Sequence, residues 1–221
     1  FRRLQTESGI SAQHFREAKE NLQRDLRALE AELNADLAFE YGVTKEKDLP
    51  KFVASHKPFH WYIEFYDIMA HGGFDVIIGN PPYVEVPKND IGYQVKGFAT
   101  DRCPDIYAMV VERATALLSP SARLGMIVPI SIVCADKFAP LQAVLASRSL
   151  WLSNYSNRPA QLFEGAQKRL TITIAAPASN AGRHVYTTEF RRWFREEREG
   201  LLPTLVYGQQ DGLPRVFESS I

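Results

Sequence analysis

The feature that most constrains this chain is a short apolar run followed directly by an asparagine and two prolines. Residues 74–79 read FDVIIG, and a run so rich in β-branched residues is typical of a buried strand. Asn80, Pro81, Pro82 and Tyr83 come next, and the prolines must end the strand because they have no N–H to donate to a neighbouring strand. The strand therefore delivers a rigid turn to its carboxyl end.

Helix and strand patterns alternate after this turn. They are predicted at residues 105–118 (helix), 123–130 (strand), 136–147 (helix), 150–156 (strand), 169–177 (strand) and 184–199 (a short strand, then a charged helix). The sequence SPSA, at residues 119–122, is expected to turn the chain. The alternation predicts an α/β fold, an open Rossmann-like sheet with helices on its faces. Ligands bind such sheets beyond the carboxyl ends of the strands, where residues 80–83 lie.

One long helix is predicted in the N-terminal part of the chain, at residues 11–39, with Ser11 as its N-cap. Its apolar residues recur at spacings of mostly three or four and form one stripe: Phe15, Leu22, Leu26, Leu29, Leu33 and Leu37. The opposite face is charged, which favours a packing helix over a coiled coil or a membrane-binding helix. Residues 44–73 have an irregular, aromatic-rich pattern.

Composition excludes several classes of protein. The chain is 45% hydrophobic and 24% charged, and no apolar run reaches the roughly 20 residues of a membrane span, so we expect a cytoplasmic protein with no membrane partner. Its start has neither an initiator Met nor the layout of a signal peptide, which favours a fragment of a longer protein. Basic and acidic residues number 26 each, so a nucleic-acid partner would need a local basic patch.

Metal and disulfide chemistry are not expected. Cys103 and Cys134 are too few for a disulfide framework or a metal site, so two reduced thiols are the favoured interpretation. His56, His60 and His71 do not have the spacing of a metal-binding motif, which favours packing or solvent exposure for them.

The turn at residues 80–83 has the chemistry to hold an amino group. The carbonyls of Asn80 and Pro81 lie beside prolines that have no N–H, and the Asn80 side chain adds another carbonyl and an amide. Tyr83 offers a flat ring for stacking, worth roughly 1–3 kcal/mol for a nucleobase. These acceptors suit a nucleobase amine or a side-chain amide, whereas a phosphate needs N–H donors. Alternatively, the turn only ends the strand, since Pro-Pro turns are common in loops.

Several segments in the same order resemble one known family. FDVIIGNPPYV looks like the fourth motif of amino-methyltransferases that use S-adenosylmethionine, above all the adenine-specific DNA methyltransferases of restriction–modification systems, especially the fused type IIG kind. CPDIYAMVVERATALLSPSARLGMIVPISIV is similar to that family's next helix and strand, and LFEGAQKRLTITIAAP to its eighth motif. PFHWYIEFYDIMAHGG matches the usual approach to the fourth motif. The resemblance covers about residues 57–177 and continues more weakly to the end.

The resemblance implies a reaction, a cofactor and a partner. Such an enzyme transfers a methyl group from S-adenosylmethionine to the exocyclic amino group of an adenine that is flipped out of double-stranded DNA. In the Asn80-Pro81-Pro82-Tyr83 motif, the Asn80 side chain and the Pro81 carbonyl would accept hydrogen bonds from the adenine amino group. Tyr83 would stack on the base, and Phe163 matches the aromatic that meets the base from the other side.

The same resemblance implies further contacts. Asp105 and Tyr107 match the motif that lines the cofactor pocket, together with Asn80. Lys168 and Arg169 are candidates for contacts with DNA phosphates, although exposed cations on a loop are as often only solvated.

This chain also departs from the family pattern. The glycine-rich turn and the acidic residue that bind S-adenosylmethionine have no counterpart here, and no Gly-x-Gly occurs. No strands are predicted before Phe74, and no target-recognition domain or nuclease motif is recognisable. We therefore expect a helical N-terminal segment (1–56), a partial methyltransferase domain (57–200) and an exit toward an absent target-recognition domain (201–221). The isolated chain is expected to bind the cofactor weakly or not at all and to be inactive.

A sheet reduced to its later strands would expose residues 74–78 along one open edge. The missing strands would then come from the rest of the polypeptide or a second chain, unless the helix at 11–39 covers the gap. Two other functions stay open. The same tetrad occurs in enzymes that methylate a glutamine amide in release factors or a guanine amine in ribosomal RNA. The chain could also be a non-catalytic, truncated module for DNA or protein contact.

Overall fold

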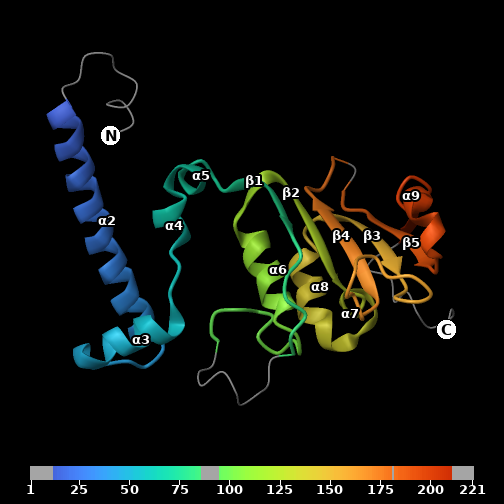
Figure 1. Ribbon diagram of the computed structural model, residues 1–221, viewed down its shortest axis with the longest axis horizontal. Helices are drawn as coiled ribbons and strands as arrows, with labels where there is room; N and C mark the ends of the chain where they lie inside the picture. Colours follow the sequence, from blue (N-terminus) through green and yellow to red (C-terminus); the bar gives the residue numbers. More distant parts are fainter. Residues whose placement is uncertain (1–11, 86–94, 181, 211–221) are drawn as a thin grey trace. The chain divides into compact units, whose positions relative to one another are not determined.

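The computed structural model describes residues 12–85, 95–180 and 182–210. The chain divides into two compact units, Phe1–Ala70 and His71–Ile221. The first unit is helical and contains α2 (Ala12–Glu40), η1 (Glu46–Asp48), α3 (Leu49–His56), α4 (Trp61–Glu64) and α5 (Tyr66–Ala70) (Figure 1). The long predicted helix is confirmed as α2, whereas its proposed N-cap, Ser11, lies outside the described residues.

The segment after α2 is more regular than its sequence pattern predicts. It contains three short helices, α3 to α5, because helices of four to eight residues are too short to develop a clear helical period. The ring of Phe52 in α3 stacks on His56 with 4.1 Å between ring centroids. His60 donates a hydrogen bond of 2.9 Å to the side-chain oxygen of Asn34 in α2. This bond ties the segment to α2, and the first compact unit ends at Ala70.

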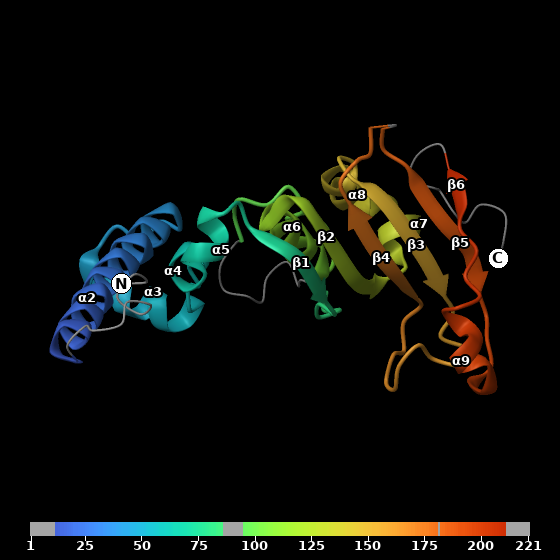
Figure 2. The ribbon, with the colours of Figure 1, turned by 90° about the horizontal axis from the view of Figure 1, so that it is seen from above.

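The second unit is built on a six-stranded sheet. Its strands are β1 (Phe74–Gly79), β2 (Leu118–Pro129), β3 (Ser149–Tyr155), β4 (Leu170–Ala176), β5 (Val185–Arg191) and β6 (Gly208–Gln210), in the spatial order β1-β2-β4-β3-β5-β6. β1 and β2 are parallel, and β4 runs antiparallel to both β2 and β3 (Figure 2). The carboxyl ends of β1 and β2 and the start of β4 therefore lie at the same end of the strands.

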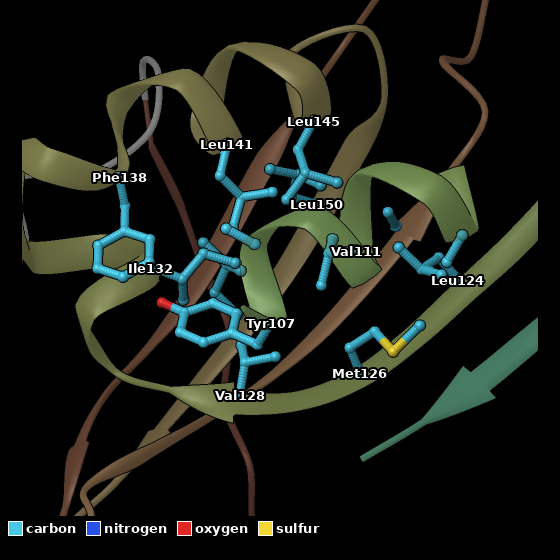
Figure 3. Packing of buried hydrophobic residues seen from close by; sticks show 14 of the residues in the cluster. Tyr107, Val111, Leu124, Met126, Val128, Ile132, Phe138, Leu141, Leu145 and Leu150 are labelled. Atoms are coloured by element: carbon cyan, nitrogen blue, oxygen red, sulfur yellow. The ribbon is translucent and has the colours of Figure 1, made fainter. Parts of the chain in front are cut away.

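The helices of this unit are α6 (Tyr107–Ala116), α7 (Ser131–Cys134), η2 (Asp136–Phe138), α8 (Ala139–Leu145), η3 (Arg195–Glu197) and α9 (Arg198–Leu201). Side chains from α6, α7 and α8 pack on one face of the sheet against alternate residues of β2, such as Leu124, Met126 and Val128 (Figure 3). On the opposite face, α9 contributes Leu201 to a smaller cluster with Tyr155 and Trp193. The predicted helices at 105–118 and 136–147 are thus confirmed with shorter bounds.

Two local expectations were wrong. Residues 119–122 do not turn the chain but belong to β2, where a register shift opposite Phe74 and Val76 accommodates them. The guanidinium of Arg148 donates a 2.8 Å hydrogen bond to the Ala122 carbonyl, so a side chain replaces a strand partner there. The expected irregular exit from residue 201 contains a strand, because β6 pairs with β5 in antiparallel orientation.

Candidate functional site

The turn at residues 80–83 leaves the sheet at the carboxyl end of β1. Gly79 is the last residue of β1 and pairs with Met126 in β2. Asn80 and Pro82 are exposed, Tyr83 is half-buried and Pro81 is buried. Just after the turn, the carbonyl of Val84 accepts a 2.9 Å hydrogen bond from the N–H of Ile106. The turn is therefore pinned to the segment that leads into α6.

The hydroxyl of Tyr83 holds the Asn80 side chain in place. It lies 2.5 Å from the side-chain oxygen of Asn80 and 2.9 Å from the carbonyl oxygen of Ile127 in β2. Burial raises the pKa of Tyr83 to about 12, so the phenol is neutral and can donate at physiological pH. The exposed amide of Asn80 is thereby connected to the backbone of the neighbouring strand.

Asp105 and Lys168 join the turn to a loop that is distant in sequence. Asp105 is only 7% exposed, and its Oδ1 lies 3.8 Å from the ammonium of Lys168. That separation allows charge attraction but exceeds hydrogen-bond length, and this Oδ1 has no hydrogen-bond partner among the described residues. Lys168 also donates to the Tyr83 carbonyl at 3.4 Å. The loop at residues 156–169 is therefore held beside the turn.

Tyr107 lies in the core rather than on a surface that a ligand could reach. It is fully buried, and its ring stacks on Phe138 at 5.0 Å between centroids (Figure 3). Its hydroxyl shares a 2.8 Å hydrogen bond with the hydroxyl of Ser131 in α7. Burial, the largest cause, strongly raises the pKa of this phenol. Of the two residues expected at the cofactor pocket after the turn, only Asp105 faces an open space.

In the part of the chain that the structure describes, the ring of Phe163 does not contact the ring of Tyr83. Phe163 lies half-buried in the 156–169 loop, where its carbonyl accepts a hydrogen bond from the N–H of Ala166. Arg169 is exposed, and its guanidinium carbon lies 5.7 Å from the centre of the Phe190 ring.

A cleft of about 600 Å³ opens next to the turn. It is lined by Asp105, Pro129, Ile130, Ser131, Asn157, Arg158, Gln167, Lys168 and Arg169. Three of the predicted site residues, Asp105, Lys168 and Arg169, thus line one cleft. Residues 80–83 do not line it, but Lys168 connects the cleft to the Tyr83 carbonyl. The sequence analysis did not single out Arg158. The one signal for it is its position at the start of the loop that ends with Lys168 and Arg169.

The residues of this chain fit only one side of an S-adenosylmethionine site. Asn80 is exposed and Asp105 contributes to the lining of the cleft with its Oδ1 buried, but the sequence has no glycine-rich turn to receive the rest of the cofactor. Within residues 12–85, 95–180 and 182–210, no group of three or more His, Cys, Asp or Glu side chains could hold a metal ion. No helix in these ranges is both long and apolar enough to cross a membrane.

Comparison with known proteins places these motifs in context. The family model of the Eco57I restriction-modification methylase matches residues 5–163. A protein of Methanocaldococcus jannaschii, named as a type II restriction enzyme and methyltransferase, is 34% identical over 110 residues, which are 50% of this chain and 9% of that protein. This chain therefore spans about a tenth of the length of that relative.

Solved structures are similar in fold. The Type ISP restriction-modification enzyme LlaGI, a nuclease-deletion mutant in complex with a DNA substrate mimic, matches with a TM-score of 0.51 and 14% identity over 66% of this chain and 18% of that one. A DrdV–DNA complex matches with a TM-score of 0.48 and 14% identity over 61% of this chain and 17% of that one. The predicted fold class is confirmed, namely the later part of an open Rossmann-like methyltransferase sheet preceded by a long helix.

Proposed function

The chain belongs to the Eco57I restriction-modification methylase family, and on that premise we propose that it carries the target-base pocket of an adenine-specific DNA methyltransferase. The family is one of restriction-modification methylases, and the proposal takes from it methyl transfer with S-adenosylmethionine as the donor. The proposal adds the acceptor, which is the exocyclic amino group of an adenine flipped out of double-stranded DNA.

The exposed amide of Asn80, held at the end of β1 by Tyr83, carries this proposal. Its carbonyl accepts a hydrogen bond from the adenine amino group and directs the nitrogen lone pair toward the methyl donor. S-adenosylmethionine, when bound, supplies the methyl group as an electrophile. Transfer would form a bond from the amino nitrogen to the methyl carbon and break the sulfur–carbon bond, while Asn80 would hold the amino group until it releases one proton to water.

The other residues of the turn position the base. The Pro81 carbonyl is the second acceptor for the amino group, and the Tyr83 ring supplies a stacking surface. Phe163 closes on the base from the 156–169 loop. Phe163 shares the 156–169 loop with Lys168, which contacts the Tyr83 carbonyl, and this placement on the same loop supports the role.

The remainder of the cofactor site lies outside these 221 residues in this proposal. Asn80 and Asp105 contribute one side, and the glycine-rich turn comes from another part of the full-length polypeptide or from a second chain. The small share of each relative that this chain spans supports that division.

The test is methyl transfer by the full-length protein, followed with radiolabelled S-adenosylmethionine. The acceptors are adenine-containing duplex DNA, release-factor protein with its target glutamine, and ribosomal RNA. We expect label on the adenine amino group of DNA, and a decrease in kcat of at least about 100-fold for Asn80→Ala, because a fixed polar group at the reacting centre is lost. The matched control is Asn180→Ala, an exposed asparagine in a turn beyond β4, which should retain full activity.

Label on the glutamine amide or on RNA would overturn the adenine assignment. Full activity of the Asn80→Ala variant on DNA would overturn the assignment of the site. No methyl transfer to any acceptor by the folded full-length protein would favour the non-catalytic module.

A further inference from the structure

The cleft beside the turn has a charge that methyl transfer to a neutral base does not require. Arg158, Lys168 and Arg169 contribute three cations to its lining, and Asp105 contributes the one carboxylate. Asp105 lies next to Lys168 and offsets its charge. Two arginines therefore remain without a compensating acid in the lining, which makes the cleft attractive to an anion.

The two arginines differ in how they are held. The Arg158 side chain is exposed and makes no hydrogen bond or ion pair with any residue that the structure describes. The guanidinium of Arg169 lies over the Phe190 ring of β5, a contact worth roughly 0.5–1 kcal/mol at an exposed site. Arg158 can thus turn to meet a ligand, whereas Arg169 is already fixed near the wall of the cleft.

The backbone around the cleft is preorganised. The side-chain amide of Asn157 donates to the carbonyl of Gln167 at 2.5 Å, which closes the neck of the loop. The N–H of Ile130, after β2, donates to the Arg169 carbonyl at 3.0 Å. Arg198 in α9 donates to the Leu162 carbonyl at 3.1 Å. These bonds fix the loop at its neck and along its length, so a ligand in the cleft would meet preformed walls.

We propose that this cleft binds the sugar–phosphate backbone of the DNA strand that carries the target base, with Arg158 and Arg169 as contacts to neighbouring phosphates. This inference rests on the proposed function and extends it to the strand on either side of the base. The volume of about 600 Å³ exceeds what a single phosphate needs. Lys168 lines the cleft and also contacts the Tyr83 carbonyl, so a strand in the cleft leads directly to the turn.

The fixed walls and unpaired arginines favour a backbone over a base as the occupant. Guanidinium groups match phosphate oxygens in geometry and charge. Asn157, Gln167 and Ser131 add neutral polar groups that suit sugar and phosphate oxygens. Contacts of this kind position a strand without reading its sequence.

The experiment measures how DNA affinity depends on salt. The full-length protein binds a fluorescein-labelled duplex with one unpaired adenine, and fluorescence anisotropy gives Kd over a series of sodium chloride concentrations. Each phosphate contact contributes roughly 0.7 to 0.9 to the slope of log affinity against log salt. We expect Arg158→Gln and Arg169→Gln each to lower the slope by about that amount, and the double variant to lower it by about twice as much.

Matched variants distinguish the effect of a positive charge in this cleft from the effect of a positive charge elsewhere on the protein. Arg158→Lys keeps the cation and should restore most of the slope. Arg183→Gln removes an exposed arginine between β4 and β5, at the opposite end of the sheet, and should leave the slope unchanged. Asn80→Ala should also leave the slope unchanged, because it removes no charge.

Unchanged slopes for both arginine variants would overturn the inference while leaving the proposed function intact. Absence of salt-dependent binding by the unsubstituted protein would overturn it too. Displacement of the probe by inorganic phosphate as effectively as by an unlabelled oligodeoxynucleotide would identify a simple anion site and contradict a strand-binding cleft. If the slopes fall as expected but adenine is not methylated, the proposed reaction fails and the strand-binding cleft stands.

Discussion

At the scale of single residues, the Tyr83 hydroxyl has two acceptors and one proton. The Asn80 side-chain oxygen and the Ile127 carbonyl both lie within hydrogen-bond distance of it. Because a neutral phenol can donate only once, Tyr83 satisfies one of these oxygens at a time. When a substrate amine donates to Asn80, the Tyr83 proton can serve Ile127 instead. Under the proposed function, the hydroxyl would orient Asn80 before the substrate binds and would donate to the Ile127 carbonyl afterwards.

This role predicts the effect of Tyr83→Phe in the full-length protein. The variant keeps the ring for stacking but loses the hydroxyl, so Asn80 is no longer oriented from Ile127. We expect kcat to fall about five- to tenfold, the equivalent of one hydrogen bond, with little change in KM for DNA. Steady-state methylation kinetics provide the measurement.

Tyr186→Phe is the matched control for this prediction. The Tyr186 ring stacks on Trp151 in β3, on another part of the sheet, so loss of its hydroxyl should change neither constant. A rise in KM with constant kcat for Tyr83→Phe would show that the hydroxyl contributes only to binding, contrary to a positioning role.

At the scale of elements, β1 is an edge strand with an apolar outer face. It pairs only with β2 in the described sheet, and Val76 and Ile78 are 56% and 82% exposed. Ile77 points the other way, into the core. A parallel strand normally has both faces covered, and an exposed apolar edge promotes pairing with other chains. Within the described six-stranded sheet, β1 is thus an edge strand, as the sequence predicts.

The exposed edge predicts self-association of the 221-residue chain. Ile78→Lys places a charge on the edge, and we expect it to reduce the fraction of oligomers in sedimentation velocity experiments. Leu202→Lys is the control, because Leu202 is 55% exposed beside α9 and not on an edge strand. Equal effects of the two substitutions would mean that general charge, and not the β1 edge, governs association.

At the scale of the whole molecule, the site depends on contacts between residues that are far apart in sequence. Lys168 reaches the Tyr83 carbonyl across 85 positions, because the start of β4 lies beside the carboxyl ends of β1 and β2. The same meeting of strands forms the cleft. The turn at residues 80–83 and the cleft therefore both lie in the second compact unit, and the sequence offers no glycine-rich turn for a cofactor site.

This division predicts the cofactor affinity of the 221-residue chain. Without a glycine-rich turn, the chain should bind S-adenosylmethionine more weakly than micromolar in isothermal titration calorimetry. The full-length protein is the reference and should bind more tightly under the same conditions. A dissociation constant of about 1 μM or lower for the short chain, equivalent to about −8 kcal/mol, would contradict the prediction.

The sequence by itself determined the features that depend on consecutive residues. The prolines after FDVIIG end β1, and the spacing of leucines predicts α2. The alternation of helical and strand patterns of apolar residues predicts the order of helices and strands. The Asn80–Tyr83 turn was identified in the same way, since its rigidity follows from proline chemistry alone. Each of these is a local property, so no knowledge of the partner segments was needed.

Only the tertiary structure decided which residues meet. Tyr107, expected beside the cofactor, is buried against Phe138 because α6 packs its first turn onto the sheet. Arg158 was overlooked because its importance comes from sharing a cleft with Asp105 and Lys168, which lie on other segments. Strand pairing brings these segments together, and the energy of that pairing depends on many distant contacts at once. No pattern of neighbouring residues records it, which is why the turn could be predicted and the cleft could not.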